Sequence, residues 1–427
     1  MPIRQNYLSR IQAIIVNVIS ARFRRFRALV CSGFVKPRAC AWPQRYAIIT
    51  VGLMIAPLLA ACAGSGAQVA SATVVEALSF GDEQAFARPT QPMAFVFPRD
   101  HGPHPAYRTE WWYYTGNLVD ADGAEFGYQL TFFRTALTPD MPARASDLAT
   151  NQIYMAHFAV TDVAANQHAS FERYARGGDK TAGAQGEPVY SVWLDAWRVE
   201  QVAPGEVQLV ASTQGENGVV SIDLTLDEQG ELLLHGDKGL SQRGPETGNA
   251  NYYYSLVRQQ TSGQIVIDGR THAVTGLSWM DHEFGAFAPS LGAVGWDWFS
   301  ATLGDGTVLM FGSFHDNQGD SRSLYGGTLG YPDGRQFALG QDDVELTPLG
   351  SWQSPTTAIR YPARWQVRIP KYNLELQIRP LVADQEMRVS IVYYEGATAV
   401  EGTLDGQPIQ GRGYVELTGY GETGAGD

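Results

Sequence analysis

The chain has 427 residues with 31 basic and 44 acidic side chains, and its three cysteines are Cys31, Cys40 and Cys62. The first 62 residues carry nine Arg or Lys and no Asp or Glu, so the remainder has 22 basic and 44 acidic residues and a net charge near −22. Such a surface repels polyanions, which excludes nucleic acid as a partner. No cysteine follows residue 62, which excludes disulfides and thiolate chemistry in the remainder.

Residues 1–62 have the pattern of a leader and signal peptide rather than of a folded domain. An apolar run from Ala47 to Ala61 follows several basic residues and ends in the order Leu-Ala-Ala-Cys, which resembles a bacterial lipobox. We therefore expect Cys62 to be acylated and its acyl anchor to be the link to the membrane. Ala63 and Gly64, which directly follow Cys62, lack the aspartate associated with inner-membrane retention, and the resemblance then implies the outer membrane of the bacterial envelope, facing the periplasm.

Three alternatives to this leader stay open. A plain signal peptide could be cleaved near Cys62 without lipidation. Residues 11–30 could form an anchor helix, or residues 1–34 could precede the true start of the product.

The composition changes again after the leader. Residues 63–90 are rich in Ala, Gly, Ser and Gln, which predicts a flexible tether. Beyond them no long segment keeps the period of an amphipathic helix, whereas β-branched and aromatic residues recur in short runs. The runs predict strands at Phe126–Thr135, Gln152–Val163, Val219–Leu226, Glu231–His235, Tyr252–Gln259, Trp296–Leu303, Val308–Phe314, Arg364–Ile369, Leu374–Ile378, Arg388–Tyr394 and Tyr414–Thr418.

Turn dipeptides separate many of these runs. Asp-Gly or Asn-Gly pairs favour the positive-φ turns that join antiparallel strands. The sequence therefore predicts an all-β, antiparallel protein, in which nearly closed barrels hide the strand edges. A stretch with Gly and Ala at 285–295 predicts the boundary between two domains, residues 91–287 and 288–427. The Asp-Gly and Asn-Gly pairs begin at Asp122, Asn217, Asp268, Asp305, Asp333 and Asp405.

The densest group of acid and base side chains lies in the segment 279–285, which reads Trp-Met-Asp-His-Glu-Phe-Gly. In an extended strand, Trp279, Asp281 and Glu283 share one face, and His282 and Phe284 share the other. A carboxyl group buried beside aromatic rings keeps its proton near neutral pH. Two interpretations stay open: the segment is the wall of an active site, or it is a hydrogen-bond network that locks two barrels together.

From these patterns we predict an acid–base site with an aromatic surround. Asp281, His282, Glu283 and Asp316 are the candidate catalytic residues. No Gly-x-Ser-x-Gly elbow is present, which argues against a serine hydrolase. The residues expected to contact a substrate are Trp279, Phe284, Trp296, Asp297, Trp298, His157, Glu110 and Trp112.

Structural roles compete with these assignments. Trp112 and its aromatic neighbours fit the filling of a barrel, and His157 fits a core histidine with a hydrogen-bond partner. Arg134 either pairs with Glu110 or reaches solvent at the rim. Two histidines near residue 100 lie three residues apart without a carboxylate at a familiar spacing, so we predict no metal centre and no cofactor.

Six motifs in this order resemble the AttH and carotenoid 1,2-hydratase family, in its "predicted secreted hydrolase" branch, over roughly residues 91–420. The resemblance implies two lipocalin-like barrel domains in tandem. The motifs are Glu110-Trp-Trp-Tyr-Tyr-Thr-Gly, Thr131-Phe-Phe-Arg, His157-Phe-Ala, Tyr252-Tyr-Tyr-Ser, Trp279-Met-Asp-His-Glu-Phe-Gly and Trp296-Asp-Trp-Phe.

For the carotenoid hydratases, the resemblance also implies a His-x-Trp pair and a Tyr-x-Asp pair that add water to a C=C bond. His282 matches the first histidine, but Phe284 stands where the family has Trp. The second pair falls on Phe314 and Asp316, where the tyrosine hydroxyl is missing.

The resulting hypothesis is an exported lipoprotein that binds a hydrophobic, lipid- or terpenoid-like molecule and hydrates or hydrolyses it. The alternatives are a non-catalytic, lipocalin-like carrier and an envelope assembly factor. The sequence indicates no particular oligomeric state.

Overall fold

The computed structural model describes residues 85–140, 149–178, 180–227, 231–286, 293–315 and 322–422. The leader with Cys62, most of the expected tether and Asp316 lie outside these ranges. Within them, no helix has both the length and the apolar character that crossing a membrane requires.

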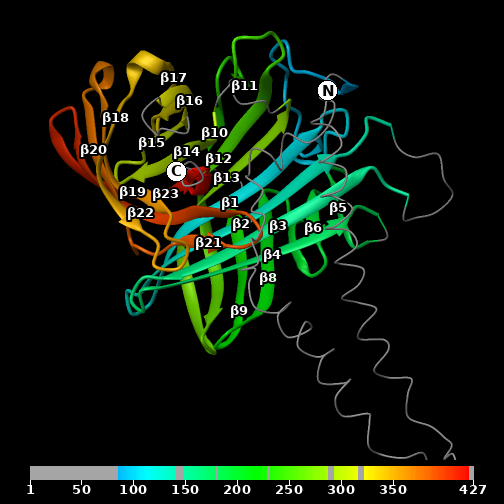
Figure 1. The fold of residues 1–427 in the computed structure, drawn as a ribbon, viewed down its shortest axis with the longest axis horizontal. Coiled ribbons are helices and arrows are strands. Elements are labelled where there is room, and N and C mark those ends of the chain that lie inside the picture. The colour runs from blue at the N-terminus through cyan, green and yellow to red at the C-terminus, as the bar shows by residue number, and fades with distance from the viewer. Residues whose placement is uncertain are drawn as a thin grey trace, which may run out of the picture. The chain divides into compact units, whose positions relative to one another are not determined.

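The described residues are almost entirely β-structure in two antiparallel sheets, as the sequence predicts. The first sheet curls into a nearly closed barrel and the second into a half-barrel (Figure 1). Beyond residue 85, helical residues in these ranges form single 3-10 turns: η2 (Arg99–His101), η3 (Gln341–Asp343), η4 (Pro370–Tyr372) and η5 (Tyr420–Glu422).

The first sheet has the strand order β4-β3-β2-β1-β13-β12-β9-β8-β7-β6-β5, and β10 and β11 also pair with β12. Its strands are β1 (Thr109–Asp120), β2 (Glu125–Ala136), β3 (Gln152–Asp162), β4 (Gln167–Arg176), β5 (Ala182–Gln185), β6 (Ser191–Leu194), β7 (Trp197–Ala203), β8 (Glu206–Gly215), β9 (Gly218–Asp227), β10 (Glu231–Leu234), β11 (Leu240–Gln242), β12 (Ala250–Ile267) and β13 (Arg270–Gly285).

The second sheet has the order β17-β16-β15-β14-β23-β22-β20-β19-β18, with β21 paired to β22. The domain boundary expected near residue 287 remains a prediction. The strands of the second sheet are β14 (Gly295–Leu303), β15 (Val308–His315), β16 (Arg322–Gly330), β17 (Gln336–Leu339), β18 (Glu345–Gln353), β19 (Arg360–Ile369), β20 (Leu374–Pro380), β21 (Glu386–Arg388), β22 (Val392–Leu404) and β23 (Gln407–Leu417).

The turn dipeptides lie at hairpins, as predicted. Five of the six Asp-Gly and Asn-Gly pairs fall between consecutive strands, and the sixth, Asn217-Gly218, ends on the first residue of β9. At Asp268 and Gly269 the φ angles are 49° and 72°, and at Asp405 and Gly406 they are 51° and 76°. Two successive positive φ angles match the right-handed twist of the strands that the turn joins.

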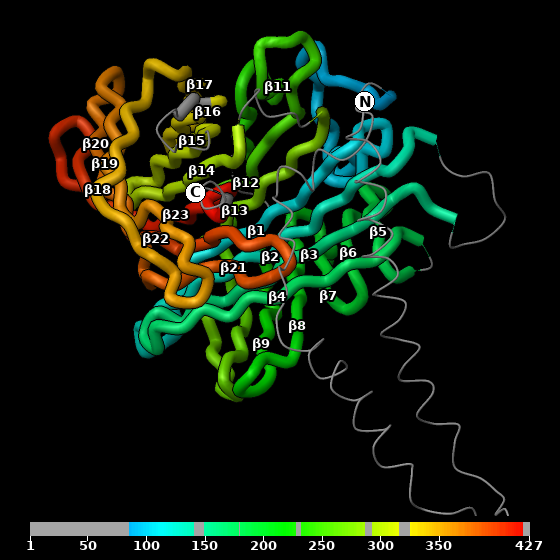
Figure 2. Tube along the Cα trace, in the orientation of Figure 1, coloured from blue at the N-terminus to red at the C-terminus, as the bar shows by residue number. Residues whose placement is uncertain are grey.

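One predicted strand was wrong. Arg388–Tyr394 does not form one strand, because β21 ends at Arg388 and β22 begins at Val392. These two residues pair antiparallel to each other, so the chain reverses between them. The apolar alternation continues through the reversal because Met387, Val389, Ile391 and Tyr393 all pack into one buried cluster. Strand β21 also contacts β4, which lies next to it in Figure 2.

Three buried clusters fill the two sheets. One lies inside the first barrel, where Tyr128, Leu130 and Phe132 of β2 point inward. A second fills the curve of the second sheet around Trp365. The third lies between the sheets and includes Trp298. Strands β1, β12 and β13 therefore have one face toward the barrel interior and the other toward the second sheet, which explains their long uninterrupted aromatic runs.

Candidate active site between the two sheets

Strand β13 places its two acidic residues on the face that meets the second sheet. Asp281 lies opposite Tyr113 of β1 and Ser255 of β12 in the strand register. Glu283 lies in the next outward-facing row, opposite Trp111 and Tyr253. The alternation expected from the sequence is confirmed, and the packing of the second sheet turns this face into a pocket wall.

Asp281 is buried and accepts hydrogen bonds through both oxygens. The Tyr253 hydroxyl donates to Oδ2 at 2.7 Å, and the Trp279 indole donates to Oδ1 at 2.6 Å. The Ser255 hydroxyl also donates to Oδ1. Burial raises the pKa of Asp281 to about 7, although these hydrogen bonds act in the opposite direction.

Glu283 forms a buried ion pair with Arg243. The arginine and the Asn251 amide both donate to Oε1 of Glu283, the latter at 2.5 Å. The guanidinium also lies over the Tyr325 ring, 4.1 Å from its centroid. Burial raises the pKa of Glu283, and Arg243 and Asn251 counteract that rise. Oxygen Oε2 of Glu283 has no hydrogen-bond partner among the described residues.

Glu416 on β23 completes the acidic side of the pocket from the second sheet. The Trp296 indole donates to its Oε2 at 2.9 Å, and Oε1 has no hydrogen-bond partner in the described ranges. No cation is among the groups that shift its pKa; burial raises it to about 7, and Asp281 and Glu283 add to the rise. Glu416 is therefore easier to protonate than a solvent-exposed glutamate.

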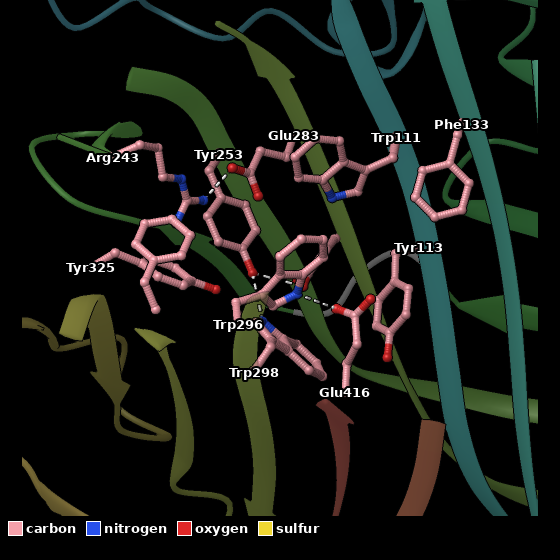
Figure 3. Close-up of a pocket in the computed structure, with 12 residues that line it drawn as sticks. Trp111, Tyr113, Phe133, Arg243, Tyr253, Glu283, Trp296, Trp298, Tyr325 and Glu416 are labelled. Carbon is pink, nitrogen blue, oxygen red and sulfur yellow. Dashed lines mark hydrogen bonds and ion pairs between the residues drawn. The ribbon is translucent and has the colours of Figure 1, made fainter. Parts of the chain in front are cut away.

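Aromatic side chains form most of the remaining wall (Figure 3). The Trp298 indole donates to the Tyr253 hydroxyl at 3.0 Å, and its ring meets Tyr113 edge-on. The cavity measures about 40 Å³, enough for roughly three water molecules. A larger ligand must therefore displace side chains as it enters. The lining residues are Trp111, Tyr113, Phe133, Arg243, Tyr253, Asp281, Glu283, Trp296, Trp298, Phe314, Tyr325 and Glu416.

The opposite face of β13 belongs to a closed hydrogen-bond network inside the first barrel. His282 is fully buried; its Nε2 is 2.9 Å from Oε1 of Glu110, and its Nδ1 is 2.9 Å from the Tyr254 hydroxyl. Arg134 donates to Oε2 of Glu110 at 2.7 Å, which realises the ion pair considered from the sequence. His104 Nδ1 also lies 2.8 Å from Oε1 of Glu110.

Electrostatics in this network favour an ionised Glu110. Burial acts to raise the pKa of Glu110, but Arg134, His104 and His282 hold it well below its usual range. Burial lowers the pKa of His282, and Glu110 opposes this effect. A neutral His282 donates from Nε2 to Glu110, and its Nδ1 lies beside the Tyr254 hydroxyl, which donates to the backbone oxygen of Asp100 at 3.1 Å.

His104, Glu110 and His282 are also the residues whose spacing fits a metal ion, with one donor atom from each within 4.8 Å of the others. Both histidine nitrogens, however, already lie at hydrogen-bond distance from the same carboxylate oxygen. Arg134 supplies the positive charge beside that carboxylate. The contacts therefore describe a hydrogen-bonded ion network more directly than a set of metal ligands.

The structure brings Trp279, Asp281, Glu283, Trp296 and Trp298 together at or beside the pocket. It separates the other candidates from it. His282, Phe284, Glu110 and Trp112 lie in the barrel network, where Phe284 stacks on His104 with ring centroids 3.5 Å apart.

Two further candidates lie elsewhere. The Tyr420 hydroxyl donates to Oδ1 of Asp297 at 2.8 Å, while Trp296 and Trp298, its neighbours in the strand, line the pocket. His157 is buried against Tyr393, with 2.7 Å between Nδ1 and the hydroxyl, and burial lowers its pKa to about 3.

Four polar residues of the pocket escaped the sequence reasoning. Glu416 lies inside the predicted strand Tyr414–Thr418, where a carboxylate among apolar residues was the available signal. Tyr253 sits in an aromatic run that also fits simple packing. Arg243 and Tyr325 lie outside every predicted strand, and the tertiary structure alone brings them to Glu283.

Solved structures resemble this fold. A crystal structure assigned as an AttH protein from Nitrosomonas europaea is 34% identical, with a TM-score of 0.67 over 78% of this chain and 100% of that chain. Kievitone hydratase from Nectria haematococca is 15% identical, with a TM-score of 0.60 over 78% of this chain and 98% of that chain. At that identity the second similarity supports the fold alone.

Sequence comparison extends the relationship. Kievitone hydratase of Fusarium solani subsp. phaseoli is 23% identical over 212 residues, which are 46% of this chain. The chain spans 57% of the length of that relative. The family model for AttH-like proteins matches residues 88–420, which include both sheets. The chain belongs to the AttH-like family.

Proposed function

We propose that this protein is a hydratase that adds water across a carbon–carbon double bond of a small hydrophobic substrate in the pocket between the sheets. The observation that carries the proposal is the pair of carboxyl groups that face one aromatic pocket in different surroundings. Glu283 is paired with Arg243, whereas Glu416 has an indole donor and no cation among its partners. The similarity to kievitone hydratase supports the reaction class.

The two surroundings suit the two halves of a hydration. A protonated Glu416 donates through its unpartnered Oε1 to one alkene carbon, and positive charge develops on the other. The ring faces of Trp298, Trp111 and Tyr253 stabilise that charge. Water then attacks the cationic carbon and passes a proton to Oε2 of Glu283. When two carboxyl groups in one site have different surroundings, one can stay protonated while the other is ionised, and the site then holds both an acid and a base.

Asp281 has a supporting role in this proposal. Both of its oxygens accept hydrogen bonds from the protein, so it acts through the Tyr253 hydroxyl rather than on the substrate. The Tyr253 hydroxyl in turn accepts a hydrogen bond from the Trp298 indole. The chain of contacts fixes the orientation of the ring that faces the developing charge.

The test is a screen of purified protein against apolar alkenes, namely a prenylated phenol, a terpenoid and an unsaturated fatty acid, in isotopically labelled water. Mass spectrometry should detect one labelled water added to a substrate. Glu416→Gln and Glu283→Gln should each lower kcat by about 100-fold or more. Glu401→Gln, an exposed change on β22, is the matched control and should keep full activity.

Two results would overturn the proposal. Full activity in both pocket variants would remove Glu416 and Glu283 from the reaction. Recovery of a bound apolar molecule that the wild type never converts would instead identify a non-catalytic carrier.

We further propose that the protein is exported and held at the bacterial outer membrane by an acyl chain on Cys62. The support is the basic leader and its Leu-Ala-Ala-Cys ending. Cys62→Ser should move the protein from the membrane fraction to the soluble fraction of the envelope. Continued membrane association of this variant would point to residues 11–30 as the anchor.

A further inference from the structure

A second cavity lies between the two sheets, beside the aromatic pocket. It measures about 380 Å³ and is lined by strand residues from β1, β13, β14 and β23, many of them small or polar. We call it the glycine-lined groove. Trp279 lines it and meets the pocket residue Trp298 edge-on, with ring centroids 6.3 Å apart, so the two spaces are lined by indole rings that contact each other. Its glycines are Gly116, Gly276, Gly304, Gly411 and Gly413.

A buried carboxyl group lies beside the proposed acid. Glu395 of β22 is directly opposite Glu416 of β23 in the strand register, and Trp298 of β14 is opposite Glu416 on the other side. Directly opposite residues project from the same face of a sheet, with Cβ atoms about 5 Å apart. Glu395 has no exposed surface, and the Tyr113 hydroxyl donates to its Oε2 at 2.8 Å.

Two buried oxygens, one on this carboxyl and one on a residue that lines the groove, lack hydrogen-bond partners among the described residues. Oε1 of Glu395 and the Tyr414 hydroxyl are both buried, and neither has a hydrogen-bond partner among the described residues. Tyr414 lines the glycine-lined groove and lies on the same face of β23 as Glu416. Buried polar atoms normally have partners, and a water molecule is the usual one where protein groups are lacking.

We propose that Glu395 resupplies protons to Glu416 from solvent in the glycine-lined groove, by way of Tyr414. The inference rests on the proposed role of Glu416 as the acid. Glu395 does not touch the substrate and acts only through Glu416. A hydrogen bond from the Tyr113 hydroxyl positions its carboxyl group, and the strand register places Glu416 directly opposite it.

The hydration cycle itself creates the need for this transfer. After one turnover Glu416 has lost a proton to the alkene carbon, and Glu283 has gained one from the attacking water. Glu395 gives its proton to Glu416 and regains one from the groove through the Tyr414 hydroxyl, while Glu283 releases its proton to water in the pocket. The cycle then returns both carboxyl groups to their starting forms with no net consumption of protons.

The charges around Glu395 favour its protonated form. It faces Glu416, Tyr113 and Tyr414, and no cation is among the groups that shift its pKa. Burial raises the pKa of Glu395 well above its usual range, and Glu416 raises it further. Two carboxylates in one buried row repel each other, so ionisation of both groups together is disfavoured and the pair retains a proton that either carboxyl can hold.

The experiment follows the protonation of Glu416 without any substrate. A rapid pH jump is combined with time-resolved infrared detection of the carboxyl C=O band, which the loss of signal in Glu416→Gln assigns. Glu395→Gln keeps an acceptor for Tyr113 but cannot relay a proton, and it should slow the protonation of Glu416 by about tenfold or more. Added imidazole should restore the rate, an effect that a merely structural role of Glu395 would not produce.

Controls make the result decisive. Glu401→Gln on the same strand should protonate Glu416 at the wild-type rate. Tyr414→Phe should slow the protonation of Glu416, and it tests the relay if Glu395→Gln folds poorly. An unchanged rate in Glu395→Gln, or in Tyr414→Phe where only that variant folds, would overturn the relay even if the protein hydrates alkenes. A slowed and rescued rate would support it even if no alkene is hydrated, which would refute only the proposed function.

Discussion

The two faces of β13 border similar acidic and basic residues, but on one face they form a hydrogen-bond network and on the other they line a pocket. Toward the barrel interior, His282 lies in a network in which Glu110 accepts hydrogen bonds or ion pairs from Arg134, His104 and His282 itself. Toward the second sheet, Glu283 keeps one oxygen without a partner and borders a cavity. A network in which each polar group has a partner stabilises the fold, whereas a carboxyl oxygen that borders a cavity without a hydrogen-bond partner can act on a ligand.

The difference also appears in the pKa values. Glu110 is held well below its usual pKa by partners that favour the carboxylate, whereas burial raises the pKa of Asp281 to about 7. The carboxyl groups that border the two faces of β13, Glu110 of β1 and Asp281 of β13 itself, should therefore respond to pH in opposite senses. Experiments on each face can sharpen or break this comparison.

The largest effect is expected from Glu110→Ala. The substitution leaves the buried Arg134 guanidinium without its carboxylate, and loss of one partner from a buried ion pair costs about 3–5 kcal/mol of unfolding free energy. Urea denaturation measures the change. A loss below about 1 kcal/mol, the value typical of exposed pairs, would contradict the structural role of this face.

The pH dependence of stability should separate the faces next. The folded pKa of Asp281 is about 7 against an ordinary value of 3.8, so its contribution is fully present below about pH 4 and is lost as pH rises toward 7. The full shift corresponds to about 4 kcal/mol. The contribution of Glu110 to stability depends on pH in the opposite direction. Its lowered pKa stabilises the fold above its ordinary pKa, and this stabilisation is lost as the pH falls.

Denaturation of wild type and Asp281→Asn across pH 4–8 isolates the first contribution. The stability of the wild type relative to the variant should decline as pH rises. A constant difference across this range would mean that Asp281 titrates normally.

A smaller effect is expected from His282→Gln. The variant loses hydrogen bonds to Glu110 and Tyr254, which should lower the unfolding free energy by about 1–3 kcal/mol. Because His282 faces away from the pocket, kcat and its pH profile should be unchanged at temperatures where the variant is folded. Loss of kcat in a folded variant would assign the chemistry to the barrel face instead.

The smallest change is expected from Tyr325→Phe. Its hydroxyl has no hydrogen-bond partner among the described residues, and Arg243 contacts the ring rather than the oxygen. Stability should therefore change by less than about 0.5 kcal/mol. A raised KM with constant kcat would show that the hydroxyl contacts the substrate, whereas a large loss of stability would contradict the contacts described for it.

Much of the fold and part of the site could be predicted from local patterns. Alternation placed Asp281 and Glu283 on one face of a strand and His282 on the other, and the turn pairs marked the hairpins. Both are properties of a few consecutive residues. The same alternation misplaced one boundary at residues 388–392, because Met387 and Tyr393, on the two sides of a tight hairpin, pack into the same buried cluster.

The sequence by itself determined an all-β, antiparallel protein with an acid-rich strand at 279–285, since side-chain alternation and turn chemistry act over short distances. Only the tertiary structure decided which face of that strand borders a pocket. The contacts that decide it join residues far apart in the chain: Tyr113 with Glu395, and Arg243 with Glu283. Strand register and sheet packing set these contacts, so Glu416 and Arg243 took their places beside Glu283 only when the second sheet covered the first.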